Sequence, residues 1–99
     1  YGITIAPHNP YGPVALAACA HVAASIQNFL ILEHCPLQPW FDRIQTQKVP
    51  VIDGHIHVND LQNRPGLGVE LDMEQVRSRP HEPIKALRYV QADGSTPLL

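Results

Sequence analysis

The order of elements in the first third of the chain constrains its fold more than any other feature. Residues 3–6 form a short apolar run that ends in a cluster of chain-breaking residues at 7–12. An Ala-rich run at 14–26, with Pro13 suited to the first turn, predicts a helix. Residues 29–32 form a continuous apolar run of the kind found in parallel strands covered on both faces. Strand, loop, helix and strand in this order predict an α/β fold with a βαβ unit, whose two strands alone cannot complete a sheet.

The predicted helix at 14–26 is apolar on nearly all sides. His21 and Ser25 are almost its only polar side chains. One side of the helix is therefore expected to contact a sheet, and another side a neighbouring helix or subunit. We interpret His21 as a packing or interface residue.

The second part of the chain has a different character. Its local patterns are strand-like pieces at 49–52 and 56–58, a Gly-rich structural turn at 65–68, and an Asp72–Gln75 capping pair for a short helix through Arg79. From residue 80 onward we expect irregular chain that lies on other protein.

Composition excludes several classes of protein. Charged residues make up 16% of the chain and the formal net charge is −2, which favours neither a disordered acidic tail nor a basic nucleic-acid-binding domain. No apolar run reaches the ~18–20 residues of a membrane span, so we predict a cytoplasmic protein. Cys19 and Cys35 lie in unrelated settings and are predicted to be free thiols. Met73 is the only methionine, so we expect Tyr1 to lie inside a longer polypeptide.

His8 and Glu33 are the strongest candidates for chemistry. Both follow predicted strands, at the C-terminal ends where a parallel αβ barrel builds its ligand site. Neighbouring strands lie ~4.8 Å apart, so the two side chains can reach one small substrate. An imidazole there can act as a general base near neutral pH, and a carboxyl group can share a proton with a developing oxyanion. The alternative is that His8 caps a loop and Glu33 makes a surface salt bridge.

Several motifs follow one another along the chain: residues 6–14, the Ala-rich helix, 28–33, 53–54, 64–72 and 93–95. In this order they resemble the end of the barrel in the mandelate racemase branch of the enolase superfamily, and most closely its galactonate dehydratase group of acid-sugar dehydratases. The resemblance implies the C-terminal fragment of a (β/α) TIM-like barrel. Residues 1–40 would be the last βα unit and final strand, and residues 41–99 a C-terminal closing segment.

The resemblance also implies a Mg²⁺-assisted dehydration of an aldonate to a 2-keto-3-deoxy sugar acid. His8 matches the base that removes the proton α to the carboxylate, and Glu33 matches a residue that hydrogen-bonds the substrate carboxylate and its enediolate. His34 and Pro10 are further candidates for substrate contact. The metal-binding carboxylates, a second acid and the aspartate that orients His8 are expected on strands absent from this chain. The fragment alone is therefore expected to be inactive.

The implied partners are the rest of the barrel, an N-terminal capping domain and further copies in a homo-oligomer. Trp40 and Phe41 are expected to close the outside of the barrel rather than line a pocket. A non-catalytic module that uses the apolar helix as an association surface stays open as an alternative.

A zinc hydrolase is the other alternative. His55 and His57 look like the His-x-His strand of amidohydrolases, with both rings on one face. That motif opens its barrel, however, and the roughly 40 residues that follow here are too few for seven more βα units. We therefore favour a partly exposed strand with two solvated rings.

Overall fold

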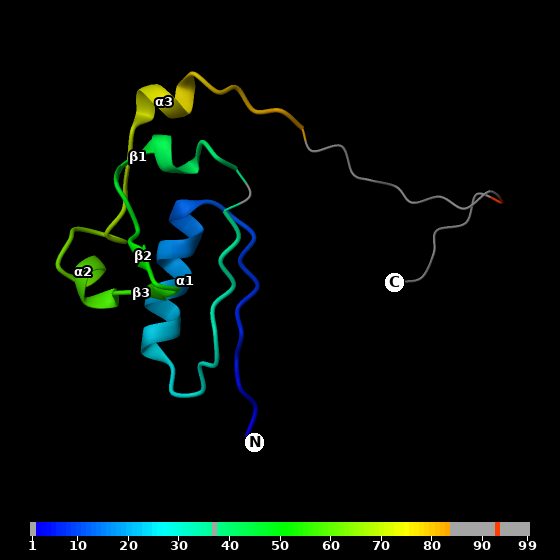
Figure 1. Cartoon of the computed structure of the whole chain (residues 1–99), viewed down its shortest axis with the longest axis vertical. Helices are drawn as coiled ribbons and strands as arrows, with labels where there is room; N and C mark the ends of the chain where they lie inside the picture. Colours follow the sequence, from blue (N-terminus) through cyan, green and yellow to red (C-terminus); the bar gives the residue numbers. More distant parts are fainter. Residues whose placement is uncertain (1, 37, 84–92, 94–99) are drawn as a thin grey trace.

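The computed structural model describes residues 2–36, 38–83 and 93 (Figure 1). Its longest helix is α1 (Pro13–Ser25). The other elements are, in chain order, the 3-10 helix η1 (Phe41–Ile44), β1 (Gln45–Gln47), β2 (Val51–Ile52), β3 (His55–Ile56), α2 (Val58–Gln62), β4 (Glu70–Leu71) and α3 (Met73–Arg77). In the described part of the chain, no helix is long and apolar enough to cross a membrane.

Helix α1 confirms the first helix predicted from the sequence, with its end one residue earlier than expected. Pro13 occupies the first turn, where a missing backbone N–H costs no hydrogen bond. The helix ends because Ile26 adopts an extended conformation, with φ −110° and ψ 143°. The chain then reverses and returns beside residues 3–8 (Figure 1).

The two segments predicted as strands lie parallel, which confirms their orientation. Ile5 and Phe29 form a parallel bridge. The Ile5 N–H donates to the Asn28 carbonyl at 2.8 Å, and the Leu30 N–H donates to the Ile5 carbonyl at 2.9 Å. Together with α1 this is the predicted βαβ unit, reduced to a single bridge. The α/β class is therefore confirmed, and the described residues do not close a barrel.

The predicted burial of these two segments is wrong. Ile3 is 70% exposed, and Leu30 and Ile31 are each 63% exposed. The physical reason is that no third strand pairs with either segment within residues 2–36 and 38–83. Apolar runs of this kind need a neighbouring strand on each side and a layer on each face.

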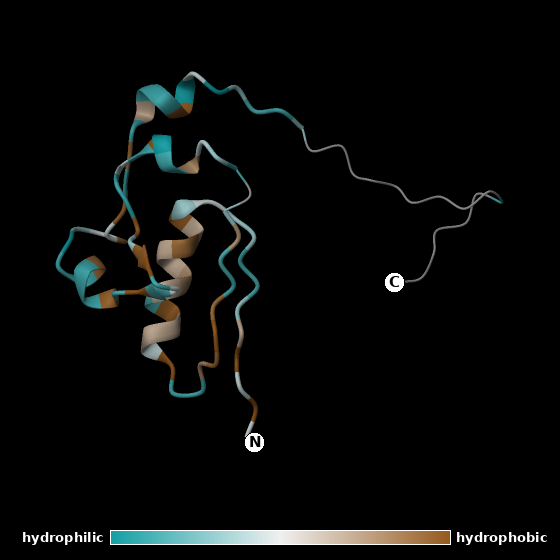
Figure 2. Ribbon diagram, in the orientation of Figure 1, coloured by the Kyte–Doolittle hydropathy of each residue, from teal (hydrophilic) through white to brown (hydrophobic). Residues whose placement is uncertain are grey.

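The core forms on one side of α1. Leu16, Ala17 and Ala20 pack with Val49 and Leu61, and both Ala17 and Leu61 are fully buried. On another side of the helix, Val14 and Val22 are exposed at 42% and 55%, although α1 is apolar along most of its length (Figure 2). The sequence predicted that two sides of α1 would be covered by other elements, and the described residues cover one of them.

His21 contacts the Gly-rich turn. Its Nε2 lies 3.2 Å from the Leu67 carbonyl oxygen. The turn itself is confirmed, since Gly66 and Gly68 have φ of 62° and 75°, and the Gly68 N–H donates to the Pro65 carbonyl at 3.1 Å. His21 is thus a packing residue that joins α1 to this turn.

The strand-like pieces form a short hairpin. β2 and β3 pair antiparallel around Asp53 and Gly54, whose φ values of 49° and 75° suit a tight hairpin turn. The strand predicted at 56–58 is wrong in its bounds, because the chain enters α2 at Val58. Helix α2 was not predicted, since a five-residue helix is too short to show a clear apolar period.

Half of the predicted capping pair is confirmed. The Asp72 carboxylate Oδ1 accepts from the backbone N–H groups of Glu74 and Gln75, each at 3.0 Å. The reciprocal bond to the Asp72 N–H is not formed, because that N–H donates to the Ile44 carbonyl at 2.8 Å and so joins β4 to η1. Helix α3 ends at Arg77, two residues before the predicted Arg79.

The last part of the chain lies mostly outside the described residues. Residues 80–83 carry no helix or strand, as expected. Gly94 and Ser95, which belong to one of the resembling motifs, are outside the described ranges.

Candidate active site

The structure brings His8 and Glu33 into direct contact. His8 Nδ1 lies 2.7 Å from Glu33 Oε2, a short hydrogen-bond distance. The side chains are 75% and 41% exposed, respectively, so the pair sits at the surface of the described chain. The ring of Tyr11 lies edge-on to His8, with 6.4 Å between ring centroids. The two residues singled out from the sequence thus face each other and can exchange a proton.

Asn9 is a part of this site that sequence reasoning missed. Its backbone N–H donates to Glu33 Oε2 at 2.7 Å, and its side-chain Nδ2 donates to the Glu33 carbonyl at 3.2 Å. Asn9 is only 1% exposed, and it is the buried polar residue among the described residues. Its position directly after His8, in a loop at a strand end, is the sequence signal that could have identified it.

The contact between His8 and Glu33 depends on an irregular strand register. The bridge pairs Ile5 with Phe29, and side chains alternate in direction along extended strands. His8 lies an odd number of positions after Ile5, whereas Glu33 lies an even number after Phe29. A regular continuation would therefore send the two side chains to opposite faces.

Pro7 accounts for the irregular register, because it has no N–H to continue the regular ladder. In a regular ladder the Leu32 N–H would donate to the Pro7 carbonyl. The structure instead has the Glu33 N–H donating to that carbonyl at 3.3 Å, one residue later. This shift has the geometry of a bulge, and it places Glu33 opposite His8.

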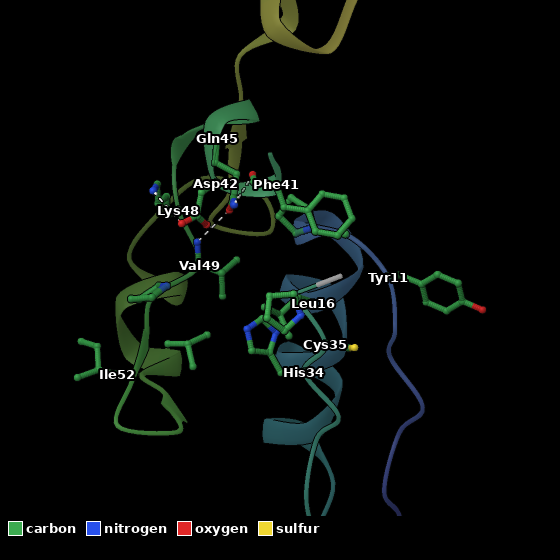
Figure 3. A pocket seen from close by; sticks show the side chains of 15 residues that line it. Tyr11, Leu16, His34, Cys35, Phe41, Asp42, Gln45, Lys48, Val49 and Ile52 are labelled. Atoms are coloured by element: carbon green, nitrogen blue, oxygen red, sulfur yellow. Dashed lines mark hydrogen bonds and ion pairs between the residues drawn. The ribbon is translucent and has the colours of Figure 1, made fainter. Parts of the chain in front are cut away.

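His34 and Pro10 do not join the pair. His34 directly follows Glu33 in the chain. It lines a cavity of about 480 Å³ together with Phe41, Lys48 and Val49 (Figure 3). His8 and Glu33 are not among the residues that line this cavity. Pro10 is half-buried in the loop and does not line it either.

Phe41 lines this cavity. Its place on the outside of the barrel stays a prediction, because the described residues do not close a barrel. A Cβ atom added at Gly12 would lie 3.6 Å from the Phe41 ring, so the ring packs against the loop that carries His8. Trp40 stacks edge-on to Phe41, with 4.8 Å between ring centroids, and Arg79 lies over the Trp40 ring.

The His-x-His motif lacks the geometry of a metal-binding strand. His55 lies on β3, and its Nδ1 contacts the Asp53 carbonyl oxygen at 2.8 Å, while His57 is the N-cap of α2. Both residues are exposed, as predicted. Among residues 2–36, 38–83 and 93, no group of three His, Cys, Asp or Glu side chains could hold a metal ion. Cys19 and Cys35 are free cysteines.

A parallel strand–helix–strand unit with an imidazole and a carboxylate at adjacent strand ends defines a class, the α/β proteins that carry their site at the carboxyl ends of parallel strands. The sequence specifies the family within this class. Residues 1–76 match the family described as Enolase C-terminal domain-like, and the chain belongs to it. The family implies the C-terminal part of a TIM barrel.

Known relatives agree with this assignment. The chain is 36% identical to a D-galactonate dehydratase family member from Streptomyces bingchenggensis, over 94% of this chain and 22% of that protein. It is 34% identical to a D-xylonate dehydratase from Haloferax volcanii, over 79% of this chain and 18% of the relative. It is 33% identical to a D-mannonate dehydratase from Caulobacter vibrioides, over 71% and 17% respectively. The likeness to acid-sugar dehydratases of the enolase superfamily is therefore confirmed.

The chain spans about a fifth of the length of these curated relatives. No solved structure is significantly similar to it.

Proposed function

We propose that the protein containing this chain is an acid-sugar dehydratase that acts on an aldonate, with galactonate as the first substrate to test. His8 would remove the proton α to the carboxylate, and elimination of the 3-hydroxyl as water would give a 2-keto-3-deoxy sugar acid. The observation that carries the proposal is the 2.7 Å contact between His8 and Glu33 at adjacent strand ends. The relatives act on galactonate, xylonate and mannonate by name, which supports the substrate class rather than one sugar acid.

The geometry of the pair indicates which atoms would act. Glu33 lies at Nδ1 of the His8 ring, so a neutral ring that donates from Nδ1 keeps its free lone pair on Nε2. Nε2 would therefore accept the proton from carbon. The electron pair of the broken C–H bond would pass into the enediolate, and the adjacent carboxylate of Glu33 would stabilise the imidazolium that forms.

Glu33 has room for a second role. Both hydrogen bonds described for its carboxylate end on Oε2. Oε1 is left to face the substrate carboxylate. If Glu33 carries a proton on Oε1, that O–H would donate to the enediolate oxygen, while Oε2 still accepts from the His8 Nδ1–H and the Asn9 N–H. The orienting partner of His8 was expected on an absent strand, and within the described residues Glu33 holds that position.

The described residues of this chain do not fit the Mg²⁺ site that the family implies. The described residues contain no three-ligand group, and the hydrogen bonds to Glu33 Oε2 come from His8 and Asn9. We propose that the metal ligands and the second acid belong to polypeptide outside this chain. Residues 1–40 would then be the last βα unit of the barrel and residues 41–99 its closing segment, in a cytoplasmic homo-oligomer.

The experiment is turnover of aldonates by the full-length protein and its His8→Asn variant, followed by 2-keto-acid formation. Loss of a general base typically costs about 10²–10⁴ in rate, so His8→Asn is expected to remove measurable dehydration. The matched control is His55→Asn, which changes an exposed ring on β3 and is expected to keep wild-type rates. Undiminished turnover in folded His8→Asn protein would contradict the assignment.

A further inference from the structure

We propose that Asn9 is a positioning residue that holds the Glu33 carboxylate against the His8 ring. The proposal rests on the proposed function, since it concerns the same proton-transfer pair. It extends that function to a residue that would act through Glu33.

Asn9 donates hydrogen bonds to both the carboxylate and the backbone carbonyl of Glu33. The backbone N–H of Asn9 reaches the carboxylate Oε2 at 2.7 Å, and the side-chain Nδ2 reaches the backbone carbonyl at 3.2 Å. His8 Nδ1 approaches the same Oε2 at 2.7 Å. One carboxylate oxygen thus lies between two donors from consecutive residues, and the rotation of the Glu33 side chain is restricted.

The orientation of the Asn9 amide follows from its neighbours. If the amide were flipped, Oδ1 would face the Glu33 carbonyl oxygen, and two acceptors would meet without a proton between them. In the observed orientation Oδ1 is buried without a hydrogen-bond partner among the described residues. An unpaired buried acceptor is unfavourable, so this orientation is fixed by the bond that Nδ2 donates to the Glu33 carbonyl.

The hydrogen bond from the Asn9 side-chain amide to the Glu33 carbonyl matters because few other contacts hold Glu33 in place. Its side chain is 41% exposed, and its backbone at this point is joined to the neighbouring segment by one further bond, from the Glu33 N–H to the Pro7 carbonyl at 3.3 Å. Without the side-chain amide, the Glu33 backbone keeps only this 3.3 Å bond to the neighbouring segment, so the strand end can shift and carry the carboxylate away from His8 and from the Asn9 N–H. The His8 ring then loses the partner that fixes its Nδ1–H form.

Asn28 provides a matched control. Its Nδ2 donates to the Ile3 carbonyl at 3.0 Å, which is the same kind of amide tether between the same two segments. It lies at the opposite end of the pairing from His8 and Glu33, on the other side of the Ile5–Phe29 bridge. A leucine at either position removes the amide hydrogen bond and keeps a similar side-chain size.

The experiment compares Asn9→Leu with Asn28→Leu in the full-length protein. Thermal unfolding checks folding, kcat and KM are measured separately, and ¹⁵N NMR of labelled histidines reports the tautomer of His8, assigned with His8→Asn. For Asn9→Leu we expect folded protein, a kcat reduced about tenfold or more, a KM changed less than about threefold, and loss of the Nδ1–H signature. For Asn28→Leu we expect wild-type kcat and an unchanged His8 signal.

The outcomes separate this proposal from the proposed function. Folded Asn9→Leu protein with wild-type kcat and an unchanged His8 signal would overturn the role of Asn9 while leaving the dehydratase assignment intact. If the wild type dehydrates no aldonate, the dehydratase assignment fails, and the NMR arm still tests whether Asn9 fixes the His8–Glu33 pair. Equal loss of kcat in both leucine variants would mean that the two side-chain amide bonds affect activity only by stabilising the fold. This result would also contradict the proposal.

Discussion

Replacing Pro7 with alanine tests whether the irregular register creates the His8–Glu33 pair. Alanine restores the missing N–H, which in a regular ladder would donate to the Leu30 carbonyl. The next bond would then come from the Leu32 N–H to the residue-7 carbonyl, in place of the Glu33 N–H that donates to it at 3.3 Å. Since side chains alternate along the strand, this change would turn Glu33 away from His8.

The expected change in the balance between the two registers follows from one added hydrogen bond. A typical backbone bond contributes about 0.5–1.5 kcal/mol net, so the balance between the two registers moves by that amount. With a factor of ten for each 1.4 kcal/mol, the ratio of regular to shifted register rises about two- to tenfold. We therefore expect kcat of Pro7→Ala to fall measurably, with about tenfold as the upper limit. Overall stability should change little, because the freer unfolded chain costs about 0.4–1 kcal/mol and offsets the new bond.

The assay is steady-state turnover of the full-length protein, with urea unfolding of the same samples. Pro39→Ala is the matched control, because it frees the unfolded chain at an exposed loop position that does not touch the paired segments. It is expected to lose about 0.4–1 kcal/mol of stability, because no new bond offsets the freer unfolded chain, and to keep wild-type activity. Wild-type kcat in Pro7→Ala, together with an unchanged His8 NMR signal, would refute the register argument.

Two further predictions concern stability, measured by urea unfolding of the full-length protein. A Cβ added at Gly68 would lie 2.7 Å from the Leu61 carbonyl oxygen, whereas one added at Gly66 would meet nothing within 4 Å, and both residues have positive φ. Gly68→Ala should therefore cost about 1–3 kcal/mol more than Gly66→Ala, whose cost is the ~1–2 kcal/mol of the left-handed backbone alone; equal losses would contradict this. Asp72→Ala removes both cap bonds of α3 and should cost about 1 kcal/mol, while Asp72→Asn should keep most of that stability; a full loss in the asparagine variant would disprove the cap.

The local elements were predictable because their causes are local. The Pro13 start and the alanine content specify α1, and the glycines at 66 and 68 specify a turn whose φ values other residues rarely adopt. Asp72 was predictable as a cap, because its carboxylate reaches N–H groups only two and three residues away. The bounds of β3 and α2 were missed, since such short elements depend on contacts with the core around Leu61 rather than on their own pattern.

The sequence by itself determined the order strand, helix, strand and placed His8 and Glu33 at the ends of two parallel segments, because strand order and helix propensity are written in local residue patterns. Only the tertiary structure decided that the two side chains face each other, that Asn9 binds Glu33 at both ends, and that His34 lines a separate cavity. The physical reason is that direction across a strand depends on register. Register is a relation between segments 24 residues apart. Here it shifts by one residue, because Pro7 lacks the N–H that would continue the regular ladder.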